Sequence, residues 1–147
     1  MTVHKCDYRV IYGDTDGMGI VYYANYLRIF EMARAEYFRD LIRDPMEMVN
    51  DDLYLIVVKS FVHYLSPATF DERLIINSWI PSASVKQASF QFNHLITEEK
   101  TGREIVTGYT VHAMTTREGK LKRMSREFLR KIHSVAAAHA PIEDFRF

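Results

Sequence analysis

The sequence predicts an α+β domain in which one long helix packs on one face of an antiparallel sheet. Two observations support this prediction. One long amphipathic helical pattern follows a first short strand, and four segments rich in β-branched and aromatic residues come after it. Because short turn sequences join these four segments, they are expected to form an antiparallel meander. The length of 147 residues favours a single domain that covers 1–147.

The first strand is expected from His4 to Tyr12, where side chains that suit a buried face alternate with mostly charged ones. A period of two is typical of a strand with one buried face. The next segment, Gly13–Gly19, contains three glycines and two aspartates. It is therefore expected to form a loop with an unusual backbone conformation.

The long helix is expected to begin near Asn25, a plausible N-cap, and to run for about four turns. Apolar residues recur there at steps of four and three, as on one stripe of a helix. The stripe consists of Tyr26, Phe30, Ala33, Tyr37 and Leu41, with Ile29 at its border. Pro45 lies shortly after the stripe and is expected to mark the end of the helix.

The remaining elements are expected to be four strands and a second helix. The strands are Leu53–Leu65, Leu74–Ile80, Val85–Thr97 and Glu104–Thr116. The segments that connect these strands contain the serine, proline and glycine residues that are typical of turns. The second helix is expected over Ser125–Ala138, and Ser125 is a candidate cap for its first turn.

Composition argues against several classes of protein. Nineteen basic residues balance nineteen acidic ones, so no overall field attracts nucleic acid or an anionic membrane. Cys6 is a single cysteine, and no Cys/His group has the spacing of a zinc site, so no metal is expected. No uncharged stretch reaches the ~20 residues that span a bilayer, and the first residues lack the apolar run of a signal peptide. A cytoplasmic protein is expected.

The densest group of chemically capable residues lies between the first strand and the long helix. Asp14 and Asp16 occur there with Gly17 and Gly19, directly before the helix begins. The start of a helix offers unpaired N–H groups and a positive dipole end, which can bind an anion or polarise a carbonyl. The spacing does not distinguish a reactive carboxylate from one that makes turn hydrogen bonds, so both aspartates are candidates.

Several segments together resemble the hotdog-fold acyl-CoA thioesterases, most closely the 4-hydroxybenzoyl-CoA thioesterase family that includes the Tol-Pal-associated bacterial enzymes. The first is Tyr12–Tyr26, YGDTDGMGIVYYANY, which is followed by EMAR at Glu31–Arg34. Shorter similarities occur at Tyr64–Ala68 and Leu121–Arg123. This resemblance, from about Tyr8 to Arg123, implies a hotdog fold in which a curved antiparallel sheet wraps one central helix. A C-terminal helix follows it here.

The resemblance implies a catalytic site around Asp16. Its carboxylate would either attack the thioester carbonyl or activate water as a general base. The donor that polarises the carbonyl would be the backbone N–H of Tyr23, at the start of the helix. The residues expected to contact substrate are Gly19, Val21, Tyr22, Lys122 and Arg123. The last two lie in a basic segment that either forms an ordinary solvated surface or binds the phosphates of coenzyme A or an acidic acyl-carrier protein.

The chain departs from the family pattern at two positions. Gly13 stands where many bacterial members carry an acidic residue, and Tyr23 stands where many carry histidine. A backbone donor at position 23 survives either side chain. The resemblance further implies no cofactor, and a homodimer or homotetramer with paired sheets and active sites at the subunit interface.

Three functions other than thioester hydrolysis are compatible with parts of the sequence. The same fold can bind an acyl chain or an acyl-carrier protein without hydrolysing it. A hotdog dehydratase would need a histidine on the long helix, which has none. Ser66 and Ser89 lack the G-x-S-x-G sequence that exposes a nucleophilic serine. Hydrolysis of acyl thioesters is therefore the leading expectation, with a non-hydrolytic binding module as the alternative.

Overall fold

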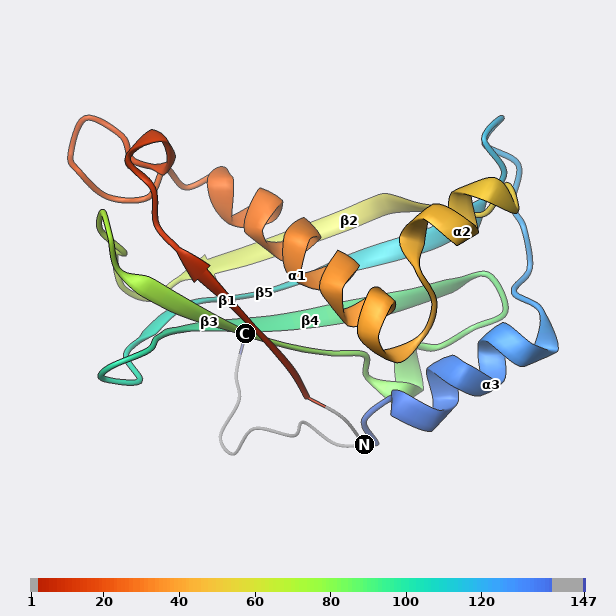
Figure 1. Ribbon diagram of the computed structural model, residues 1–147. Helices are drawn as coiled ribbons and strands as arrows, with labels where there is room; N and C mark the ends of the chain where they lie inside the picture. Colours follow the sequence, from red (N-terminus) through yellow and green to blue (C-terminus); the bar gives the residue numbers. More distant parts are fainter. Residues whose placement is uncertain (1–2, 139–146) are drawn as a thin grey trace.

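One long helix, α1 (Asn25–Leu41), crosses one face of a curved, five-stranded antiparallel sheet (Figure 1). The structure is a computed structural model that describes residues 3–138 and 147. The other elements are β1 (His4–Arg9), α2 (Pro45–Asn50), β2 (Tyr54–Tyr64), β3 (Arg73–Trp79), β4 (Ser89–Glu98), β5 (Glu104–Thr115) and α3 (Arg126–Val135). This arrangement confirms the α+β class, the wrapped central helix and the C-terminal helix.

The sheet is not the simple meander that the sequence predicted. Its strand order is β1-β3-β4-β5-β2, so β3, β4 and β5 are consecutive neighbours but β2 lies at the edge beside β5. The reason is that the connection after β2 makes no tight hairpin. It packs instead against the loop before α1, where the N–H of Val21 donates to the carbonyl of Ala68 at 2.8 Å. The chain thereby crosses from one sheet edge toward the other.

The edge strand β2 is exposed and irregular. Its pairing with β5 shifts register between Val57 and Lys59, which leaves Val58 as a bulge. Three neighbouring apolar side chains of this strand, Ile56, Val57 and Val58, are between 44% and 56% exposed. In the described part of the chain, β2 has a partner strand on one side only.

Helix α1 has the predicted bounds but not the predicted cap. Its stripe is buried as expected from Tyr26 to Tyr37, where Tyr26, Phe30 and Tyr37 are at most 3% exposed, and Leu41 at its end is partly buried. Asn25 is the first helical residue rather than the cap, and its side-chain amide donates to the carbonyl of Asp14 at 2.9 Å. Pro45 begins α2 instead of only ending α1, since proline suits the first turn of a helix.

Two expected strands and the last helix are shorter than predicted by at least three residues. The first strand ends at Arg9 because Tyr12–Asp14 form a 3₁₀ turn. Strand β4 begins at Ser89 rather than Val85, after a second 3₁₀ turn at Ser82–Ser84. Helix α3 ends at Val135, and its predicted cap is confirmed because the Ser125 hydroxyl accepts the N–H of Phe128 at 3.1 Å.

Two buried histidines lie in the core between α1 and the sheet. The ring of Phe30 stacks on His94 with centroids 4.4 Å apart. Hydroxyl oxygens contact one nitrogen of each histidine, Ser78 with His94 at 2.9 Å and Thr110 with His112 at 2.7 Å. The other nitrogen of each ring has no hydrogen-bond partner among the described residues. Burial lowers the pKa of His112 to about 3 and that of His94 well below its usual value.

Gly108 on β5 allows α1 to approach the sheet. A β-carbon at this position would lie 2.5 Å from the carbonyl oxygen of Phe61 and 2.7 Å from the ring of Phe30. We expect Gly108→Ala to lower the free energy of unfolding by about 1–3 kcal/mol, because the core must expand to accept a methyl group. Urea unfolding measures this loss. Gly13→Ala is the control, since its β-carbon would meet no atom within 4 Å, and similar stabilities for both variants would contradict the prediction.

Candidate active site

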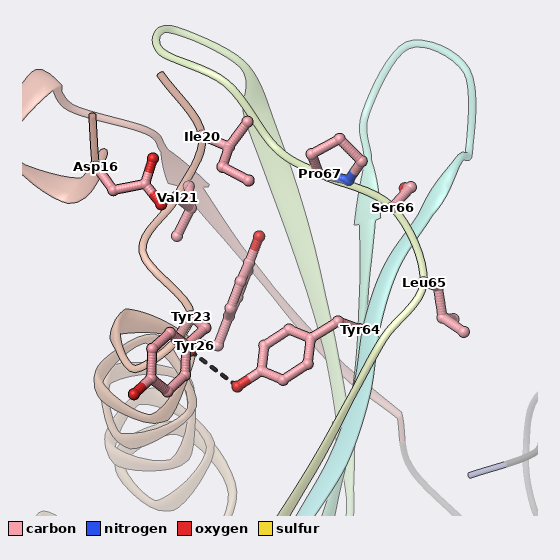
Figure 2. Close-up of a pocket in the computed structure, with 9 residues that line it drawn as sticks. All are labelled: Asp16, Ile20, Val21, Tyr23, Tyr26, Tyr64, Leu65, Ser66 and Pro67. Atoms are coloured by element: carbon pink, nitrogen blue, oxygen red, sulfur yellow. Dashed lines mark hydrogen bonds between the residues drawn. The ribbon is translucent and has the colours of Figure 1, made fainter. Parts of the chain in front are cut away.

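A cavity of about 470 Å³ opens where the loop before α1 meets the end of β2 (Figure 2). Two segments that are far apart in the sequence form its wall: the loop with the first turn of α1, and the end of β2 with the residues that follow it. The lining residues are Asp16, Ile20, Val21, Tyr23, Tyr26, Tyr64, Leu65, Ser66 and Pro67. Most of these side chains are apolar or aromatic, and Asp16 supplies the carboxylate.

The loop that carries Asp16 is a tight turn. The backbone N–H of Asp16 donates to the carbonyl of Ile20, and the N–H of Gly19 donates back to the carbonyl of Asp16, both at 2.9 Å. Gly19 has a φ of 78°, a left-handed conformation that favours glycine. Oxygen Oδ1 of Asp16 accepts the N–H of Met18 at 2.8 Å, whereas Oδ2 has no partner among the described residues. One oxygen is therefore held and the other is available.

The two aspartates of the loop have different environments. Asp14 is completely buried, and its two oxygens accept three hydrogen bonds from Tyr8, Ile11 and Arg28. Asp16 is only partly buried and lines the cavity. Because the Asp14 carboxylate is completely buried behind three protein donors, no substrate or water can reach its oxygens. The geometry therefore favours Asp16 over Asp14 as the reactive group.

The start of α1 supplies unpaired donors beside the same cavity. Helix residue Asn25 donates its N–H to the carbonyl of Tyr22. The N–H groups of Tyr23 and Ala24 have no acceptor within the described part of the chain. The Tyr64 hydroxyl donates to the carbonyl of Tyr23 at 3.1 Å, which fastens the helix start to β2 (Figure 2). This turn can present N–H groups to a developing negative charge.

The tyrosines around the cavity are hydrogen-bond donors at neutral pH. Burial raises the pKa of Tyr26 to about 12 and also raises the pKa of Tyr64. A hydrogen bond with Tyr23 raises the pKa of Tyr22, and the nearby charge of Asp16 adds to this effect. All three phenols therefore stay protonated and cannot serve as bases near pH 7.

The structure brings together some of the predicted site residues and separates others. Asp16, Val21 and Tyr23 share the cavity, and Gly19 and Tyr22 lie beside it in the same segment. Within one chain, Lys122 and Arg123 lie at the opposite end of α1. There the Lys122 ammonium donates to the carbonyl of Asp51 at 2.7 Å, next to the end of α2.

Sequence reasoning missed part of the cavity wall. It assigned Tyr26 to the core stripe and gave no role in the site to Tyr64–Pro67. These residues join the site because β2 ends beside the helix start, a contact that no local pattern reveals. The resemblance of Tyr64–Ala68 to a segment of the hotdog-fold thioesterases is the sequence signal that could have placed these residues at the site.

The described residues, 3–138 and 147, include no group of three or more His, Cys, Asp or Glu side chains that could hold a metal ion. Within the same ranges, none of the helices is long and apolar enough to cross a membrane.

Comparisons with known proteins agree with this architecture. Residues 10–132 match the family model of the thioesterase-like superfamily. Acyl-CoA thioesterase YbgC from Haemophilus influenzae is 36% identical over 85 residues, and the match spans 57% of this chain but only 61% of that protein's length.

Solved structures extend the similarity to most of the chain. A probable thioesterase from Bartonella henselae has a TM-score of 0.77 and 29% identity, covering 84% of this chain and 100% of its own. A 1,4-dihydroxy-2-naphthoyl-CoA thioesterase from Synechocystis has a TM-score of 0.80 at 20% identity, covering 89% of this chain and 96% of its own. The latter likeness shows a shared fold.

Proposed function

Because the chain belongs to the thioesterase-like superfamily, we propose that it hydrolyses acyl-CoA thioesters to a free acid and a thiol. One observation carries this proposal: the partly free carboxylate of Asp16 and the unpaired N–H of Tyr23 belong to residues that line one cavity. The name of the YbgC relative, an acyl-CoA thioesterase, supports the same reaction class. The fold is the hotdog fold that the sequence resemblance implied.

In the proposed reaction, the thioester carbonyl lies between Asp16 and the start of α1. As a general base, Asp16 takes a proton from water while the water oxygen attacks the carbonyl carbon. As a nucleophile, a carboxylate oxygen attacks that carbon, and water later opens the resulting anhydride. In both routes the N–H of Tyr23 stabilises the oxyanion, the C–S bond breaks, and the thiolate leaves with the electron pair.

The wall of the cavity suits an acyl group. Ile20, Val21, Leu65 and Pro67 supply aliphatic surface, and Tyr26 supplies an aromatic ring. The thiol carrier is proposed to be coenzyme A, with an acyl-carrier protein as the alternative carrier. Thiol release from a panel of aliphatic and aromatic acyl-CoA thioesters tests the reaction class. Saturable binding of these thioesters with no thiol released would instead support the acyl-binding module.

A homodimer or homotetramer is proposed as the working form, with β2 as the pairing edge. Two copies of an antiparallel edge strand related by a two-fold axis align opposite ends of that strand. The Tyr54 end of one β2 would then lie beside the Tyr64 end of the other. Thr115 pairs with both Tyr54 and Leu121, so Lys122 and Arg123 belong to the Tyr54 end. A second copy would thus bring its basic pair toward the Asp16 cavity, where coenzyme A phosphates need it.

We expect Val57→Asp/Val58→Asp to convert the assembly into single chains and to lower kcat/KM by ~10-fold or more, because the site loses residues of the second copy. Like charges across the two-fold axis would repel at these exposed positions. Analytical ultracentrifugation and thiol release measure both effects. Met46→Asp, at a residue of α2 that is 65% exposed and lies outside β2, is the matched control. A wild-type protein that sediments as a single chain at micromolar concentration would contradict the proposal.

A further inference from the structure

A buried carboxylate, Asp14, connects three segments around the candidate site. Its Oδ2 accepts the hydroxyl of Tyr8 on β1 at 2.7 Å and the backbone N–H of Ile11 at 2.9 Å. Its Oδ1 accepts Nη2 of Arg28 on α1 at 2.8 Å. The carboxylate is 0% exposed, so each of these bonds replaces a bond to water. Strand, loop and helix are tied together through this one side chain.

The main-chain carbonyl of Asp14 holds one residue on each side of the proposed oxyanion donor, Tyr23. This carbonyl oxygen accepts the N–H of Tyr22 and the side-chain amide of Asn25, both at 2.9 Å. Tyr23 lies between these two residues in the sequence, and Asp16 follows Asp14 by two positions. The relative placement of the Asp16 carboxylate and the Tyr23 N–H is therefore set at Asp14.

The chemistry of the pocket around Asp14 requires a carboxylate. The three groups that point at its oxygens are all donors: a phenol, a backbone amide and a guanidinium. An asparagine side chain offers one acceptor oxygen and turns an NH₂ group toward the remaining donors. At least one buried donor would then lose its partner, which costs more than an exposed hydrogen bond.

From these contacts we propose that Asp14 is a positioning residue for the thioesterase reaction, acting with Tyr8 and Arg28 to hold Asp16 and the Tyr23 amide at reacting distance. This inference rests on the proposed function for its kinetic consequence. The hydrogen-bond network itself is independent of that function. Asp14 touches no reacting atom in this scheme, which distinguishes it from Asp16.

Kinetics of variants with intact folds test the proposal. Asp14→Asn is expected to lower kcat by ~10²-fold with KM changed less than about threefold, because a displacement near 1 Å of reacting groups has such an effect on rate. Arg28→Gln and Tyr8→Phe are expected to lower kcat less, since each removes one of the three bonds. Arg28→Lys, which keeps the charge, is expected to restore part of the rate lost in Arg28→Gln.

A matched control comes from the same helix. Arg39 pairs with Glu36 on the surface of α1, so Arg39→Gln removes an ion pair without touching Asp14 and should leave kcat unchanged. A second readout needs no substrate. Amide hydrogen exchange of the Tyr22 N–H is expected to accelerate in Asp14→Asn and in Arg28→Gln, and not in Arg39→Gln.

The outcomes separate the alternatives. Wild-type kcat in folded Arg28→Gln and Tyr8→Phe would overturn the positioning role, even if Asp14→Asn fails to fold. Loss of all activity in Asp14→Asn, with activity retained in Asp16→Asn, would also overturn it and make Asp14 the reacting acid. If the wild-type protein releases no thiol from any acyl-CoA, the proposed function is wrong. Unchanged hydrogen exchange of the Tyr22 N–H in Asp14→Asn and Arg28→Gln would separately show that the Asp14 network does not hold the start of α1.

Discussion

Replacing Asp16 with asparagine is expected to lower kcat for thiol release by ~10²–10⁴-fold, with a much smaller change in KM. Asparagine keeps an oxygen that can accept the N–H of Met18, so the turn should retain its shape. It can neither take a proton from water nor attack the carbonyl as a carboxylate. The loss should therefore appear in the chemical step. Thiol trapping at saturating acyl-CoA measures it.

A surface aspartate provides the control for this substitution. Asp40 pairs with His4 on the other side of the molecule and has a largely exposed side chain, so Asp40→Asn should retain the wild-type kcat. Equal rates for Asp16→Asn and the wild type would remove the carboxylate from the mechanism. The cavity would then have to act through binding and the Tyr23 amide alone.

Acid is expected to destabilise the fold steeply between pH 7 and pH 5. His94 and His112 stay neutral in the folded protein because burial lowers the pKa of both, with the nearby charge of Arg34 adding to the effect. In the unfolded chain they titrate near pH 6.5. Below that pH the unfolded state binds two protons that the folded state does not, so stability falls as pH decreases. The two groups together remove about 4 kcal/mol between pH 7 and pH 5.

The pKa of each histidine in the folded protein sets the pH at which this loss of stability stops. The loss contributed by His112 should level off near its folded pKa of about 3, and that of His94 continues until it is protonated in the fold. Urea unfolding at pH 7, 6 and 5 measures the loss. His112→Gln should reduce the loss by about half, whereas His63→Gln, at an exposed position, should not change it. Constant wild-type stability over this range would show that the histidines accept protons in the fold.

Local patterns in the sequence were sufficient to predict the helices and strands that bury one face. The alternation in β1 and the stripe on α1 depend on side chains within a few residues of one another, and both are found in the structure. Strand order depends on contacts between distant segments. The turn-like residues after Tyr64 therefore suggested a hairpin to β3, although this connection packs on the loop that ends at Val21.

The part of the candidate site that lies within one motif could be predicted from the sequence, and the part that comes from distant segments could not. Asp16 and Tyr23 lie in one loop and helix start, so a single motif places them together. Tyr64 comes from a strand that follows the helix, and its contact with Tyr23 exists only after the sheet has formed. Lys122 and Arg123 were grouped with the site by resemblance, yet one chain holds them at the far end of the helix.

The bulge at Val58 has a consequence for how this chain avoids harmful self-association. Strand β2 exposes three consecutive apolar side chains, and a straight, exposed apolar edge strand is a template for fibres. The extra residue twists the strand locally and is followed by the positive charge of Lys59. A neighbour must match that irregular shape to fit, which disfavours open-ended stacking.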